Sequence, residues 1–253
     1  MTVTRVFLNG CNGKMGKVIT EMVSSREDII ITAGSDANTQ TSSYPVYSCI
    51  LDAKEEYDVI VDFSHISAFE KVIQAAYEKK KPLVMCTTGL SEENKQALIR
   101  LADTSAVFYS GNMSLGINVL ICLAQKAASI LYPEFDIEIV EAHHNQKLDA
   151  PSGTALMIAD KVNQTLDNKL EYVYDRHDVR KKREKKEIGL HAIRGGNIVG
   201  EHSIMYIGPE EIITISHSAQ TRNVFARGAV AAAKFLDKKK PGLYSMDDLV
   251  GQL

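Results

Sequence analysis

The chain has 253 residues, enough for one large domain or two smaller ones with a sizeable hydrophobic core. Its apolar fraction of 45% and charged fraction of 24% are those of an ordinary water-soluble protein, and a net charge of −3 argues against a nucleic-acid-binding or membrane-surface protein. The cysteines are scattered without a C-x-x-C pair and no signal peptide precedes the first apolar run, so we expect a reduced, cytoplasmic protein without a disulfide framework.

A buried strand is predicted over residues 3–8, and a glycine-rich turn followed by a helical apolar stripe comes directly after it. Strand, glycine-rich turn and helix form the context in which such glycines bind a dinucleotide. Gly10 would permit the tight turn, Gly13 the approach of a pyrophosphate, and Gly16 the close packing of helix on strand. The spacing is G-x-x-G-x-x-G instead of G-x-G-x-x-G, so a plain glycine-rich turn stays open as an alternative.

A second strand is predicted over residues 29–33, and Asp36 follows it. Asp36 lies about twenty residues after Gly16, the last glycine of the turn, where an acid commonly binds the adenine ribose. Ala37 comes next, and no arginine stands near to meet a 2′-phosphate. A charge-assisted hydrogen bond to that phosphate would contribute about 1.5–3 kcal/mol. We therefore expect NADH or NADPH as cofactor, with a mild preference for NADH that Lys14 could partly offset.

Strands and helices then alternate along the chain. This alternation predicts an α/β fold, a Rossmann-like doubly wound sheet of parallel strands. Ligands bind at the carboxyl ends of such strands, so the loops that begin at Asp62, Thr87 and Gly111 should line the nicotinamide half of a cleft. The predicted elements are strands over 59–63, 83–86 and 106–109 and helices over 68–79 and 91–102.

After a helix predicted over 117–131 and a strand over 135–140, residues 141–156 read EAHHNQKLDAPSGTAL. Two histidines, a lysine and an aspartate are expected on a loop between a strand end and the start of a helix over 154–166, where catalytic groups and anion sites are common. His143 and Lys147 are candidate proton donors near neutral pH. Ser152, Gly153 and Thr154 offer N–H groups, a hydroxyl and a helix dipole that suit a carboxylate. A small anionic substrate follows from this combination.

Other interpretations of the same residues are weaker. The histidine pair could be structural, and Ser152 could be only a helix cap. A hydrolase triad of Ser152, His143 and Asp149 lacks a G-x-S-x-G turn. Adjacent histidines rarely point at one ion, so we expect no metal at His143 and His144.

The remaining chain predicts strands over 187–194, 198–207 and 211–219, separated by glycine-containing turns. They indicate a second domain of α+β type on an open, mostly antiparallel sheet. We expect a dinucleotide-binding domain over 1–114, completed by a helix over 222–236 and the tail to 253, and a substrate-binding and oligomerisation domain over 115–221. The charge run over 180–186 is expected to be a solvated loop.

Over nearly its full length the chain resembles the 4-hydroxy-tetrahydrodipicolinate reductase (dihydrodipicolinate reductase) family. The most specific part of the resemblance lies within residues 141–155, from Glu141-Ala-His-His through Lys147 and Asp149 to Pro151-Ser-Gly-Thr-Ala. Comparable family elements also match the turn over 10–16, Asp62-Phe63, Thr87-Thr88-Gly89, Asn112, Arg194-Gly-Gly, Gly200-Glu-His202 and Arg222.

The resemblance implies hydride transfer from NADH or NADPH to a cyclic imine-type dicarboxylate, giving tetrahydrodipicolinate on the diaminopimelate route to lysine. It implies a homotetramer joined through the sheets of the second domain. It implies that His143 and Lys147 donate protons and that His144, Lys147, Gly153 and Thr154 hold the substrate. The implied cofactor contacts are Gly10, Cys11, Asn12, Gly13, Lys14, Met15, Asp36, Cys86, Thr87, Thr88, Ser110, Gly111, Asn112 and Met113.

Two positions depart from the family pattern. Cys86 stands where many members have glycine, and Ala37 replaces an arginine that some members use for NADPH. Two other functions stay open from the residues alone. One is a related NAD(P)-dependent dehydrogenase acting on another amino or keto acid, and the other is a non-catalytic dinucleotide sensor.

Overall fold

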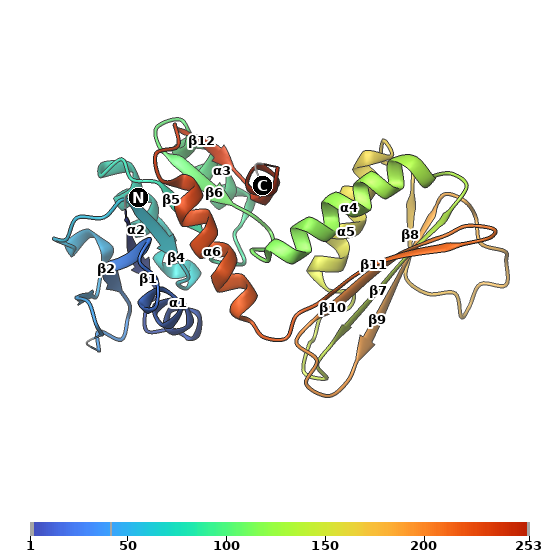
Figure 1. Ribbon diagram of the computed structural model, residues 1–253, viewed down its shortest axis with the longest axis horizontal. Helices are drawn as coiled ribbons and strands as arrows, with labels where there is room; N and C mark the ends of the chain where they lie inside the picture. Colours follow the sequence, from blue (N-terminus) through green and yellow to red (C-terminus); the bar gives the residue numbers. More distant parts are fainter. Residues whose placement is uncertain (1–2, 41, 252–253) are drawn as a thin grey trace. The chain divides into compact units, whose positions relative to one another are not determined.

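The computed structural model describes residues 3–40 and 42–251. Two compact units are present, one formed by the chain up to Leu115 together with the chain from Asn223 onward, the other by Gly116–Arg222 (Figure 1). These bounds lie next to the predicted domain boundaries, and the roles assigned to the two domains stay predictions at this point. Of the described helices, none combines the length and apolar character that a membrane crossing requires.

The first unit contains a parallel seven-stranded sheet in the order β12-β6-β5-β4-β1-β2-β3. Its central strands are buried on both faces, as parallel strands covered by helices require. The predicted Rossmann-like sheet is confirmed; β3 and β12 were not predicted. The strands are β1 (Thr4–Asn9), β2 (Ile29–Ser35), β3 (Val46–Tyr47), β4 (Val59–Asp62), β5 (Leu83–Met85), β6 (Ala106–Tyr109) and β12 (Gly242–Tyr244).

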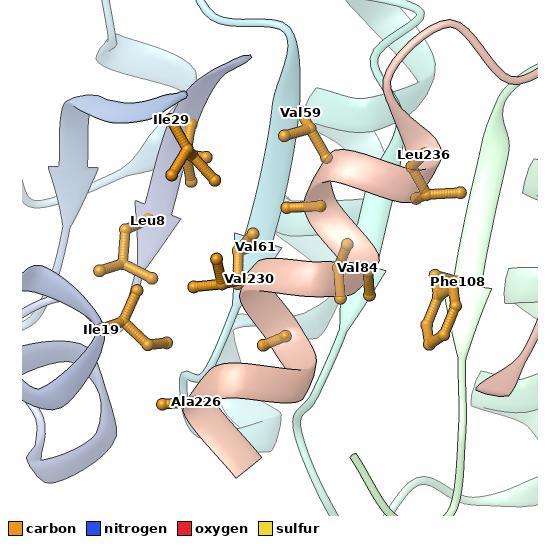
Figure 2. Close-up of a cluster of buried hydrophobic side chains, with 14 of the residues drawn as sticks. Leu8, Ile19, Ile29, Val59, Val61, Val84, Phe108, Ala226, Val230 and Leu236 are labelled. Carbon is orange, nitrogen blue, oxygen red and sulfur yellow. The ribbon is translucent and has the colours of Figure 1, made fainter. Parts of the chain in front are cut away.

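Helices cover both faces of this sheet. Apolar side chains of α1 (Lys14–Ser24) and α6 (Asn223–Leu236) form one hydrophobic core with the strands, and those of α2 (Phe69–Glu78) and α3 (Glu92–Ala102) form the other. Figure 2 shows Ile19 of α1 and Val230 of α6 against Leu8, Val61 and Val84. The C-terminal segment therefore completes the first unit. The remaining helices of this unit are short: η1 (Ile50–Asp52), η2 (Ile66–Ala68) and α7 (Met246–Val250).

The second unit contains a five-stranded sheet in the order β11-β10-β7-β9-β8. Apolar side chains of α4 (Leu115–Leu131) and α5 (Gly153–Thr165) pack on one face of it, and the two helices lie side by side in Figure 1. The strands are β7 (Asp136–His143), β8 (Glu171–Val173), β9 (Glu187–Arg194), β10 (Glu201–Ile207) and β11 (Ile212–Ser218).

The prediction that this second sheet is mostly antiparallel is wrong, because the sheet is mixed. β10 runs antiparallel to β7 and β11, whereas β9 runs parallel to β7 and β8. The chain leaves β7 through α5, and a crossover of this kind returns the chain in the parallel direction. The glycine turn after β9 also does not join neighbouring strands, because β9 and β10 lie on opposite sides of β7.

The charge run over 180–186 is largely exposed, as predicted for a solvated loop, with one exception. The Arg183 guanidinium donates to the carboxylates of Asp136 and Glu138 at 2.9 Å and to three backbone carbonyls. It therefore fastens the loop to the start of β7.

Substitution of Phe108 tests the hydrophobic core to which α6 contributes. The Phe108 side chain is fully buried and meets the Phe235 ring edge-on at 6.1 Å. Phe108→Ala should lower the free energy of unfolding by about 3–5 kcal/mol, because burial is lost and a cavity remains. Urea denaturation measures this change. Tyr77→Ala, at a side chain 59% exposed, should change stability by less than about 0.5 kcal/mol, and equal effects of the two variants would contradict the assignment.

Candidate active site

A cavity of about 370 Å³ opens in the first unit at the carboxyl ends of β1, β2 and β4. β1 has β2 on one side and β4 on the other, so the chain changes direction across the sheet at this point. Ligands of doubly wound sheets bind at such a switch point. The lining includes Gly10, Gly13, Asp36, Ala37, His65 and Lys71.

The glycine turn is shaped by two close backbone approaches. Gly10 has φ +78°, and a β-carbon there would lie 2.5 Å from the Phe63 carbonyl oxygen. A β-carbon at Gly16 would lie 2.3 Å from the Gly10 carbonyl oxygen, so α1 can pack on the turn only without a side chain there. Gly13 precedes Lys14 and Met15, the first residues of α1. The first turn of a helix leaves N–H groups without intrahelical partners, which suits a phosphate.

Asp36 holds the loop after β2 against the glycine turn. Its carboxylate accepts from the Asn12 N–H at 3.0 Å and from the Asn38 N–H at 2.9 Å. The Asn12 side chain donates in turn to the carbonyls of Asn38 and Gln40. Asp36 is therefore fixed at the edge of the cavity, at the position expected for a ribose-binding acid.

The loops after β4, β5 and β6 carry the other predicted cofactor contacts. Asp62 is fully buried and accepts from Asn9 Nδ2 at 2.6 Å and Thr87 Oγ1 at 2.7 Å, which ties the first two loops together. Thr88 is exposed beside it. After β6, the Asn112 side chain accepts from the Ser114 N–H at 2.8 Å; Ser110, Gly111 and Met113 belong to the same turn.

Two thiols near this cavity stay protonated at neutral pH. Burial, reinforced by the charge of Asp62, raises the pKa of the Cys86 thiol well above its ordinary value. Burial and the charge of Asp36 raise the pKa of the Cys11 thiol to about 11. Neither side chain is therefore a nucleophile near neutral pH.

In the second unit, the helix-covered face of the sheet changes from apolar to polar at the carboxyl end of β7. Ile137 and Ile139 belong to the core, whereas Glu141 and His143 continue the same face. The adjacent strands continue the change, because β9 places Arg194 beside His143 and β10 places His202 beside Glu141. A cluster of titratable side chains results where the core ends.

Glu141 is the centre of this polar cluster and is fully buried. Its Oε1 accepts from Arg194 Nη2 at 2.7 Å and from the Ser152 N–H at 3.0 Å. Its Oε2 contacts Arg194 Nη1 at 2.8 Å and His143 Nδ1 at 2.6 Å. Burial by itself would raise the pKa of this carboxyl, but the hydrogen bonds from Arg194, His143 and Ser152 outweigh burial and lower it. Glu141 is therefore ionised and fully paired.

Ser152 is the N-cap of α5, and its hydroxyl faces the protein interior. Its Oγ accepts from the Ala155 N–H at 3.1 Å and contacts His202 Nε2 at 2.9 Å. Burial, with the charge of His143, lowers the pKa of His202 to about 4, so this imidazole is neutral near neutral pH. The capping interpretation of Ser152 is correct, and its hydroxyl is engaged inside the protein.

The predicted proton donors lie on two different elements. The sequence placed His143 on a loop, but it is the last residue of β7. Its carbonyl accepts from the Gly195 N–H at 2.9 Å, so the ladder with β9 extends through it. Lys147 lies in the following loop, where its N–H donates to the His144 carbonyl and its ammonium contacts Asp149 at 3.0 Å. The histidine is thus held by the sheet, whereas the lysine is held by contacts within the loop.

The helix start expected to bind a carboxylate is open. Gly153 is the first residue of α5 and is exposed, and no atom lies within 4 Å of a β-carbon placed there. Thr154 follows it in the first helical turn, and His144 is half-buried nearby in the sequence. The positive dipole end of α5 is exposed at Gly153, and the ammonium of Lys147, with a hydrogen bond from the Gly153 backbone, lowers the pKa of the Asp149 carboxyl there.

Several residues of the two sites had no predicted role. Glu141, Arg194 and His202 were noted only as family elements, although Glu141 continues the apolar alternation of β7 and so had to be a buried carboxylate. His65 and Lys71 line the cavity of the first unit, and no local pattern in the sequence indicates this. Among residues 3–40 and 42–251, no group of three His, Cys, Asp or Glu side chains is placed to hold a metal ion.

Comparison with known proteins identifies the family. The model of the dihydrodipicolinate reductase N-terminus matches residues 4–113, and the model of the C-terminus matches residues 116–250. A 4-hydroxy-tetrahydrodipicolinate reductase of Caldanaerobacter subterraneus subsp. tengcongensis is 53% identical over 246 residues, 97% of this chain and 98% of that one. One of Clostridium botulinum is 45% identical over 98% of both chains.

Solved structures share the fold. A dipicolinate-bound dihydrodipicolinate reductase from Paenisporosarcina sp. TG-14 covers 100% of both chains with a TM-score of 0.82 at 24% identity. GenD2 from gentamicin A biosynthesis, in complex with NAD, covers 99% of this chain and 91% of its own with a TM-score of 0.61 at 12% identity. The resemblance seen in the sequence is confirmed by the family models and the relatives, and the chain belongs to the dihydrodipicolinate reductase family.

Proposed function

We propose that this chain reduces 4-hydroxy-tetrahydrodipicolinate to tetrahydrodipicolinate with NAD(P)H, in the diaminopimelate route to lysine. Removal of the 4-hydroxyl requires one hydride, one proton and the loss of water. Relatives named for this reaction align with almost the whole chain, which supports the proposal. The free cysteines agree with the reduced, cytoplasmic setting expected from the sequence.

The observation that carries this proposal is the segment from the end of β7 to the start of α5, which contains a histidine, a lysine and a helix N-terminus within residues 143–154. His143 and Lys147 would supply the proton. At the exposed N-terminus of α5, a substrate carboxylate would take the place that the Asp149 carboxylate holds at the Gly153 backbone, with Thr154, His144 and Lys147 as further polar contacts. The related Paenisporosarcina enzyme binds dipicolinate, a ring with two carboxylates.

The reaction is tested by generating the substrate in place from pyruvate and aspartate semialdehyde with the preceding synthase. Absorbance of the reduced nicotinamide should fall only when both the synthase and this chain are present. Nucleotide binding without oxidation would remove the reductase proposal and favour a sensor or a different substrate.

Lys147→Ala tests the proton donor. Loss of a general acid should lower kcat about 100-fold or more while NADH binding to the first unit is kept. Lys169→Ala is the matched control, because Lys169 contacts Asp167 at 2.8 Å as Lys147 contacts Asp149. Steady-state kinetics and NADH titration measure the two effects. Full turnover in Lys147→Ala would exclude Lys147 from the mechanism.

The first unit takes an NAD(P) cofactor, and we propose a mild preference for NADH. The Asp36 carboxylate at the cavity edge would repel a 2′-phosphate, and Ala37 beside it offers no cation. Lys71 lines the same cavity, so a 2′-phosphate would still find some positive charge. The preference should therefore be small.

Ala37→Arg tests this explanation. A guanidinium beside the 2′-phosphate should shift the ratio of kcat/KM for NADPH over NADH by about 10- to 100-fold, as expected for one charge-assisted hydrogen bond. Gln40→Arg adds the same charge to the same loop, outside the lining of this cavity. Equal shifts in the two variants would mean that discrimination does not depend on position 37.

We also propose that the uncovered face of the second sheet joins four copies of the chain. Within Gly116–Arg222 both helices pack on the opposite face, and Ile193 and Ile212 are 53% and 62% exposed on strands β9 and β11. Exposed apolar side chains on an open sheet face are typical of an interface.

Light scattering should give a mass of about 112 kDa, four times 27.9 kDa. Ile193→Asp should reduce this mass, because a charge would be buried at the interface. Ile99→Asp in the first unit, at a side chain 45% exposed, should leave it unchanged. A monomeric wild-type protein would contradict the proposed assembly.

A further inference from the structure

We propose that Glu141 is a positioning residue, whose carboxylate fixes the tautomer of His143 and ties this histidine to the turn that begins α5. The proposal rests on the proposed function, in which His143 donates a proton. Glu141 itself is buried and touches neither substrate nor cofactor in this account. Its effect reaches the reaction through His143 and Ser152.

The hydrogen bond to Glu141 determines which tautomer of His143 is present. An ionised carboxylate only accepts hydrogen bonds, so the contact of 2.6 Å between Glu141 Oε2 and His143 Nδ1 requires a proton on Nδ1. Nε2 is then the nitrogen that gains and loses the transferable proton. A β-carbon at Gly200 would come within 3.1 Å of Nε2, so the glycine leaves space beside this nitrogen.

Arg194 offsets the negative charge of Glu141 and thereby limits how strongly this charge stabilises a protonated His143. A lone buried carboxylate beside an imidazole would stabilise the imidazolium strongly and make it a poor acid. Two hydrogen bonds from the guanidinium, at 2.7 and 2.8 Å, neutralise that charge while leaving Oε2 as an acceptor for Nδ1. His202, whose ring centre lies 5.2 Å from that of His143, is neutral and adds no competing charge.

The same ion pair holds the segment that precedes α5. Glu141 Oε1 accepts from the Ser152 N–H at 3.0 Å, and Arg194 Nη2 donates to the Asp149 carbonyl at 2.6 Å. Both ends of residues 149–152 are thus fastened to one carboxylate–guanidinium pair. The proton donor and the helix start expected to bind the substrate carboxylate are therefore held at a fixed spacing.

The chain contains a matched control on the same strand. Glu138 also contacts an arginine and a histidine, with Arg183 Nε at 2.9 Å and His191 Nε2 at 2.8 Å. Because side chains alternate along a strand, Glu138 lies on the face opposite to Glu141. Glu138 thus has the same type of partners without access to His143 or Ser152.

The first experiment compares the pH dependence of kcat in Glu141→Gln and Glu138→Gln. Glu141→Gln removes the negative charge that stabilises the protonated donor, so turnover should persist only at lower pH. The falling alkaline limb should move down by about one pH unit or more, and kcat at neutral pH should drop about 100-fold. The KM for NADH should stay unchanged, and Glu138→Gln should leave the alkaline limb of the kcat profile at the same pH as in the wild type. Glu141→Asp should restore part of kcat.

The second experiment reads the tautomer without turnover. Long-range ¹H–¹⁵N NMR of the imidazoles, with His143 assigned by loss of its signal in His143→Gln, should show neutral His143 protonated on Nδ1 in the wild type. Wild-type His143 protonated on Nε2 would overturn the proposal, even if Glu141→Gln did not fold. A folded Glu141→Gln variant whose alkaline limb of kcat lies at the same pH as in the wild type would also overturn it. A wild-type protein that oxidises no NADH would contradict the proposed function, and the NMR result would still decide the role of Glu141.

Discussion

A buried charge has to be paired on every side, and this constraint organises the second unit around Glu141. Removing an ionised carboxylate from water costs several kcal/mol, so its position is stable only when hydrogen bonds replace its hydration. Here the replacement comes from β9 through Arg194, from β7 through His143 and from the N-cap of α5 through Ser152. Three elements are thereby fixed relative to one another where the hydrophobic core ends.

The first unit meets a steric constraint at the corresponding point of its own sheet. Backbone atoms approach one another so closely around Gly10 and Gly16 that side chains are excluded. This lets the turn after β1 and the start of α1 lie at the edge of the cavity proposed to hold the nucleotide. Asp36 then fixes the neighbouring loop by accepting from the backbone of Asn12. The proposed nucleotide site is thus shaped mainly by backbone, whereas the proposed proton donors depend on side-chain charge.

Under the proposed function the two units supply different parts of one reduction. The first holds the source of the hydride, and the second holds the groups that deliver a proton and bind a carboxylate. The sheet fixes the direction of the His143 side chain at the end of β7. Lys147 lies on the following loop, where the backbone is not held by a sheet. The neutral His202 beside them adds bulk and a hydrogen bond to Ser152 without adding charge.

The sequence by itself determined the family, the parallel sheet of the first unit, the glycine turn and the stretch that carries His143 and Lys147. Each of these depends on local spacing, which is visible along the chain. Only the tertiary structure decided which strands of the second sheet are neighbours, that His143 belongs to a strand, and that Lys71 lines the nucleotide cavity. It also decided the partners of Glu141, because Arg194 lies 53 positions away, and those of Ser152, because His202 lies 50 positions away. Contacts over such separations follow from strand order and register, and the alternation of apolar and polar residues that predicts a strand carries no information about its partner.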